Sequence, residues 1–149
     1  MSKTTATLND LIEVLNDGAT FYRDAAETVE DGTYENLFRR MAACKQEIST
    51  DLKAEVAARG DSPASGGTVL GALRQVYTDV RAGMSEQPEK QFVAQLEESE
   101  DRILEAFREA LFESDRAEVR AIAQKHMPTV NRMHEEMRTL KQHLQARAS

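Results

Sequence analysis

The sequence contains little glycine, proline or cysteine. Of its 149 residues, 7 are glycine, 3 are proline and 1 is cysteine. Because few residues of the first two kinds are available for turns, we expect a few long helices and not many short strands. A single cysteine excludes an internal disulfide bond, which fits a reducing cytoplasm.

The sequence also lacks an excess of basic residues and long apolar runs. Its formal net charge is −7, and no basic stripe with interleaved aromatic residues is present. We therefore expect neither a nucleic-acid partner nor an anionic membrane surface. No run approaches 18 apolar residues, and the opening "MSKTTATLND" has no apolar signal-peptide core, so we expect a cytoplasmic protein. The sequence leaves homo-oligomers open and indicates no particular protein partner.

Apolar residues recur at helical spacing in four long segments and one shorter one. Thr7 is a suitable cap for the first helix, and Gly32 is expected to end it in a left-handed conformation. The stretch "GDSPASGG" is the clearest loop, and Ser114 or Asp115 is expected to cap the last helix. The expected helices span residues 8–29, 34–59, 68–84 (the short one), 89–113 and about 116–144.

The last helix contains Pro128 within a heptad-like apolar seam. Since the seam keeps its phase across the proline, we expect a kink near residues 124–128 and not a break into two helices.

This pattern predicts an all-α protein made of two antiparallel helical hairpins. A long connection with its own short helix joins the second and third long helices. One such crossover between hairpins defines a ferritin-like four-helix bundle. We expect a single domain over residues 7–145, with a disordered N-terminal tail at 1–6 and a C-terminal tail at 146–149.

Four polar residues, one on each long helix, are predicted to lie at similar depth when residues are counted from the turns. They are Asp17, Lys45, Glu100 and His126, and Tyr22 is expected to reach a carboxylate such as Glu100. We interpret them as a structural layer in which Lys45 Nζ lies within about 4 Å of Glu100 or Asp17. His126 would hydrogen-bond Glu100. Two alternatives stay open: a weak metal site of Glu100 and His126, or long side chains that reach solvent without forming a layer.

The signature of a di-iron bundle is absent. Such a site needs a Glu on each of two helices and Glu-x-x-His on each of the other two. No histidine of this chain follows a glutamate at that offset. We therefore expect no cofactor, with iron as the alternative. The segment "EESED", residues 97–101, is interpreted as a solvated face.

Three segments resemble a small bacterial four-helix-bundle family that is ferritin-like, rubrerythrin-related in shape and catalogued as a domain of unknown function. They are "LNDLIEVLNDGATFYRDAAE" at 8–27, "GGTVLGALRQVYTDVRAG" at 66–83 and "LEESEDRILEAFREAL" at 96–111. The resemblance covers about residues 7–144 and implies mainly the fold.

The resemblance also shows where this chain departs from metal-binding relatives. In rubrerythrin-like proteins the second helix carries Ala, then Glu three residues on, then His three further. Here Ala42 is followed by Lys45 and Ile48. The carboxylate of the third long helix looks retained as Glu100. At the position of the first-helix carboxylate this chain has Leu15, with Asp17 close by. The last helix has His126 without the glutamate that accompanies the histidine in those relatives.

These observations favour a non-enzymatic ferritin-like bundle that acts through its surface or by self-association. One alternative is a degenerate metal-binding protein, an iron oxidoreductase or store, that uses Glu100 and His126 with Asp17. Another is a ligand-binding bundle that uses a gap between the short crossover helix and the core.

Overall fold

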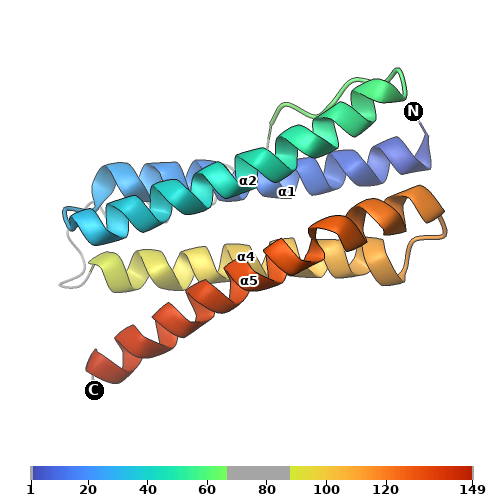
Figure 1. Ribbon diagram of the computed structural model, residues 1–149. Helices are drawn as coiled ribbons and strands as arrows, with labels where there is room; N and C mark the ends of the chain where they lie inside the picture. Colours follow the sequence, from blue (N-terminus) through green and yellow to red (C-terminus); the bar gives the residue numbers. More distant parts are fainter. Residues whose placement is uncertain (1, 67–87, 149) are drawn as a thin grey trace.

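The computed structural model describes residues 2–66 and 88–148. In this part of the chain it has four α-helices and no strand, which confirms the all-α bundle. The short helix expected at 68–84 lies outside the described residues. The helices, shown in Figure 1, are α1 (Lys3–Thr28), α2 (Gly32–Ala58), α4 (Pro88–Phe112) and α5 (Ala117–Ala148).

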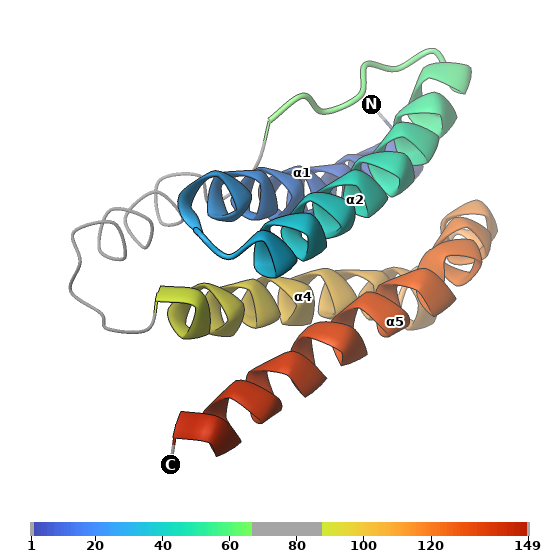
Figure 2. The same cartoon turned by 60° about the vertical axis from the view of Figure 1, so that its left-hand side comes forward.

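The helices form two antiparallel hairpins that pack against each other. α1 packs mainly on α2, α4 packs mainly on α5, and α1 also contacts α4. Helices α2 and α4 run in one direction, while α1 and α5 run in the other (Figure 1). Helix α5 is inclined to α4, and its C-terminal end diverges from the rest of the bundle (Figures 1 and 2).

Helix α1 begins earlier than the sequence predicts. Ser2 is its N-cap, and the Ser2 hydroxyl accepts a hydrogen bond from the backbone N–H of Thr5 at 3.1 Å. The expected cap at Thr7 is therefore wrong, and residues 3–6 are helical where a disordered tail was expected. In addition to this local cap, Thr4 donates to Glu118 at 3.0 Å on α5, a tertiary contact that local pattern cannot reveal. Helix α5 likewise continues to Ala148, into the expected C-terminal tail.

The turn between α1 and α2 also differs from the prediction. Gly32 is the first residue of α2 and does not end α1 in a left-handed conformation. Asp31 caps α2, and its Oδ1 accepts from the backbone N–H of Thr33 at 2.8 Å. An aspartate directly before the glycine offers a better cap than the following threonine. Among the described glycines, only Gly60 has a positive φ, of 79°, and it ends α2 as expected.

Residues 60–66, the described part of the "GDSPASGG" loop, are fastened to α1 by polar side chains. Three residues of α1 supply them: Thr5, Asn9 and Asn16. The Asn9 side chain makes two such contacts: it donates to the Ser62 carbonyl at 3.3 Å and accepts from the Ala64 backbone N–H at 2.8 Å. The bonds of Asn9 and Asn16 satisfy backbone groups of the loop, whereas Thr5 donates to the Asp61 side chain. The loop partners along α1 are Asp61, Ser62, Ala64 and Gly66.

A continuous apolar core joins the four helices. Helix α5 is a single element with Pro128 inside it, so the expected absence of a break is confirmed. None of the helices in residues 2–66 and 88–148 has the length and apolar character needed to cross a membrane. The largest fully buried apolar side chains are Tyr22, Phe21, Phe38, Phe92, Phe107, Leu8, Ile12, Leu15, Met41, Leu52 and Leu96.

Candidate functional site

A buried ion pair lies between the two hairpins. The Lys45 ammonium on α2 pairs with Glu100 Oε1 on α4, and both side chains are 0% exposed. The predicted contact between Lys45 and one of the two candidate carboxylates is therefore present. Lysine and glutamate are almost never fully buried unless they are paired, because desolvation of either charge alone is costly.

The other two helices complete the surroundings of the lysine. Tyr22 on α1 donates its hydroxyl to Glu100 Oε1 at 2.7 Å, and Lys45 Nζ lies 5.1 Å from the centre of the Tyr22 ring. On α5, the Met133 sulfur accepts from Lys45 Nζ at 3.4 Å. All four helices thus contribute to one group, which we call the Lys45 cluster: Tyr22, Lys45, Glu100 and Met133.

The hydrogen bonding of Glu100 is asymmetric. Its Oε1 receives both the ammonium of Lys45 and the hydroxyl of Tyr22. Its Oε2 is buried and has no hydrogen-bond partner among residues 2–66 and 88–148. A buried acceptor without a partner carries a desolvation cost of about 1–3 kcal/mol. The Lys45 cluster therefore includes one polar atom whose burial opposes folding.

The Tyr22 hydroxyl is held in its neutral form. Burial raises the pKa of Tyr22 well above its usual value, and the adjacent negative charge of Glu100 raises it further. A phenolate at this position would be desolvated and would face a carboxylate, so both effects favour the protonated form. Tyr22 therefore remains a hydrogen-bond donor to Glu100 throughout the physiological pH range.

A glycine on α1 makes room for the lysine stem. A β-carbon at Gly18 would lie 2.9 Å from Lys45 Cδ and 3.0 Å from Ile103 Cδ1. Real β-carbons essentially never approach other atoms to less than 3.0 Å. Sequence reasoning missed this residue, although a glycine in the middle of a long helical pattern is a signal of close packing.

The structure does not bring the other two predicted residues into the Lys45 cluster. Asp17 is buried on α1, but it forms no ion pair with Lys45 within the described residues. The prediction that His126 bonds Glu100 is wrong: its Nε2 lies 2.6 Å from Asp51 Oδ2 on α2. Counting residues from the turn assumed parallel axes, whereas α5 is inclined to α4 (Figure 2). As a result Met133, and not His126, reaches the depth of Glu100.

The Asp51 carboxylate contacts two side chains of α5, His126 and Lys125. Besides His126, Lys125 Nζ lies 3.2 Å from the same Oδ2 atom. Partial burial alone would raise the pKa of Asp51, but the hydrogen bonds from His126 and Lys125 outweigh it and lower the pKa. The pair links α2 to α5 across the surface of the bundle.

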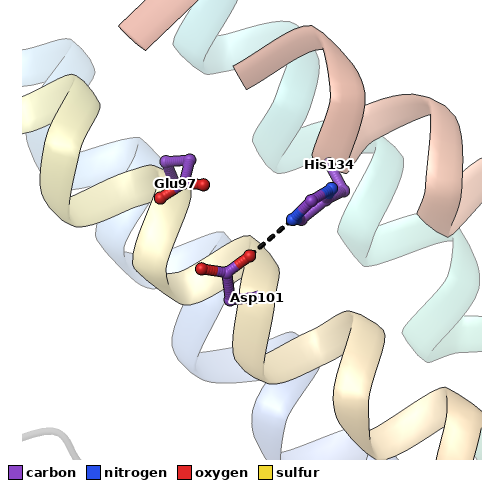
Figure 3. Close-up of side chains that lie close together, drawn as sticks. All are labelled: Glu97, Asp101 and His134. Atoms are coloured by element: carbon purple, nitrogen blue, oxygen red, sulfur yellow. Dashed lines mark hydrogen bonds and ion pairs between the residues drawn. The ribbon is translucent and has the colours of Figure 1, made fainter. Parts of the chain in front are cut away.

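A second group of ionisable side chains lies between α4 and α5. Figure 3 shows Glu97 and Asp101 of α4 and His134 of α5 facing one another. One possible ligand atom from each lies within 4.8 Å of the others. The interpretation of "EESED" as a solvated face is therefore wrong in part, since Glu97 and Glu100 are buried. The signal that was available is the spacing of Glu97 and Asp101, which places both on one helix face.

The described residues around Lys45 do not fit a di-iron centre. Such a centre needs carboxylates and histidines from four helices. Here an ammonium lies in the interior, Glu100 Oε1 already has two partners, and His126 is engaged by Asp51. The Lys45 cluster offers a single carboxylate and no imidazole.

Comparison with known families identifies a match over most of the chain. The model of a family described as a domain of unknown function (DUF2383) matches residues 3–113. The matched range contains three residues of the Lys45 cluster, Tyr22, Lys45 and Glu100, and excludes α5. No curated protein matches the chain.

Proposed function

The chain belongs to the domain-of-unknown-function family DUF2383, and from that premise we propose that it is a non-enzymatic, ferritin-like helical bundle. In this proposal the Lys45 cluster replaces a di-iron centre, and the protein acts through its surface or by self-association. Its interior then has a structural role and performs no redox chemistry.

One observation carries the proposal: the fully buried ion pair between Lys45 and Glu100. A metal ion held among carboxylates neutralises their charge, and an ammonium at the same depth does so without a metal. A cation bound beside Glu100 would also meet the positive charge of Lys45 at short range, which is strongly unfavourable in a low-dielectric interior.

The ferritin-like part of the proposal concerns the connection between the hairpins. The parallel directions of α2 and α4 support a crossover along the length of the bundle (Figure 1). The attachment of residues 60–66 to α1 supports the same path, because Asn16 contacts Gly66 further along α1 than Thr5 contacts Asp61. In our proposal this crossover completes the ferritin-like topology.

Iron content tests the proposal. The protein would be purified from iron-supplied cells as wild type, as Glu100→Gln and as the control Glu98→Gln, which changes an exposed neighbour on α4. We expect all three to retain the same small amount of iron, because no iron would depend on Glu100. Two irons per chain in the wild type and in Glu98→Gln, lost in Glu100→Gln, would overturn the proposal.

A further inference from the structure

We propose that Glu97, Asp101 and His134 form a binding site for one divalent transition-metal ion, with Zn²⁺ as the representative, between α4 and α5. This site is separate from the Lys45 cluster, and it does not depend on the function proposed above.

The placement of the three side chains suits a shared ion. Glu97 and Asp101 lie four residues apart on α4 and therefore project from one face, opposite His134 on α5 (Figure 3). Their candidate ligand atoms lie within 4.8 Å of one another. Ligand atoms around one Zn²⁺ ion lie at most about 4.2 Å apart, since each bond is about 2.1 Å long. Small side-chain rotations would be enough to bring all three atoms to one ion.

The donor set indicates the class of metal. One imidazole and two carboxylates suit divalent transition-metal ions such as Zn²⁺, Mn²⁺ or Fe²⁺, whereas Mg²⁺ and Ca²⁺ prefer sites made only of oxygen. Three protein ligands also leave coordination positions for water, as in open zinc sites.

Two of the three ligand side chains are mostly enclosed by the protein, and the third is exposed. The Glu97 and His134 side chains are 11% and 12% exposed, while Asp101 is 56% exposed and leaves the site accessible from solvent. The Nε2 atom of His134 lies 2.5 Å from Asp101 Oδ1. Its Nδ1 atom lies 3.6 Å from Glu135 Oε1, so a carboxylate faces the nitrogen that would not bind the metal.

Within the described part of the chain, a lysine is the one positive group that contacts a ligand of this site directly. Lys141 Nζ lies 3.3 Å from Glu97 Oε2, and the Lys141 side chain is 31% exposed. Because it is not enclosed, Lys141 can turn into solvent when a cation arrives, and its charge then opposes binding only weakly.

The chain supplies its own control for this site. His126 resembles His134: each side chain is 12% exposed, and each contacts an aspartate on another helix. The two differ in the third group. Lys125, an ammonium, is the third member at His126, whereas Glu97, a second carboxylate, is the third member at His134. Only the His134 group can surround a cation with three ligands.

Calorimetric titration with ZnCl₂ tests the proposal on the full-length chain as wild type, His134→Gln, Asp101→Asn and the control His126→Gln. We expect one Zn²⁺ per chain in the wild type and in His126→Gln. Affinity should fall at least about tenfold in His134→Gln and Asp101→Asn, the loss typical of disturbed metal sites. Absence of binding in the wild type, or equal affinity in wild type and His134→Gln, would overturn the proposal. Equal loss in His126→Gln and His134→Gln would also overturn it. Circular dichroism of each variant establishes that the helices are intact.

Discussion

The methylene stem of Lys45 occupies the space that a side chain at Gly18 would need. A β-carbon at Gly18 would lie 2.9 Å from Lys45 Cδ and 3.2 Å from Lys45 Cε. A glycine within a helix costs about 0.5–1 kcal/mol relative to alanine. The chain therefore carries a residue that weakens α1, and this residue admits a buried lysine from α2.

Substitution Gly18→Ala should destabilise the protein although alanine is the better helix former. We expect a loss of about 1–3 kcal/mol in the free energy of unfolding, the usual cost of overpacking a core. Urea unfolding measures it. Gly32→Ala is the matched control, because a β-carbon there would meet nothing within 4 Å.

Urea unfolding of Gly18→Ala in a Lys45→Ala background tests whether contact with the lysine stem causes this loss of stability. Once the lysine stem is gone, the penalty of Gly18→Ala should fall by at least about 1 kcal/mol, as expected for residues in contact. An unchanged penalty would mean that Gly18 is required for another reason.

Substitution Tyr22→Phe should change how stability depends on alkaline pH. The folded pKa of Tyr22 lies above its unfolded value of about 10. Its contribution is therefore complete below about pH 10 and is lost as pH rises toward the folded pKa. Urea unfolding across the alkaline range should show a steeper fall for the wild type than for Tyr22→Phe. Parallel curves would contradict the assignment.

Substitution Asp51→Asn should change the acid side of the stability profile. The folded pKa of Asp51 is lowered, so its contribution is complete above its unfolded value of about 3.9 and is lost as pH falls through the folded pKa. At neutral pH we expect a modest loss of about 1 kcal/mol or less, because the pair is partly exposed. Below about pH 4 the variant should approach the wild type in stability. A difference that persists at low pH would show that the carboxylate charge is not responsible.

The sequence predicts the helices well because their apolar spacing is regular over many turns. It predicts helix ends less well: α1 starts at Lys3 because Ser2 caps it, and Thr4 is held by Glu118 from the far end of the chain. A local pattern contains no information about such a partner. The buried position of Lys45 could be predicted because its charge lies beside an apolar stripe on α2.

Some partners of the site residues could be predicted from the sequence, and others depend on how the helices pack. Residue counts place Lys45 at the depth of both Asp17 and Glu100 and leave the choice between them open, and the structure pairs it with Glu100. The same count fails for His126, because the inclination of α5 shifts which residue reaches that depth. The group of Glu97, Asp101 and His134 could not be predicted, because two of its members lie in the charged segment "EESED". The carboxylates of that segment differ in burial only once the helices are packed.

The coupling energy between Lys45 and Glu100 tests the central claim most directly. Urea unfolding of the wild type, Lys45→Met, Glu100→Gln and the double variant gives this energy. Each single substitution should cost about 3–5 kcal/mol, since it leaves the other charge buried and unpaired. The double variant should recover at least about 2 kcal/mol of the summed loss. The same cycle at the exposed pair of Lys125 and Asp51 should give less than about 1 kcal/mol. Losses at Lys45 and Glu100 that add within about 0.5 kcal/mol would contradict the claim that this ion pair organises the interior.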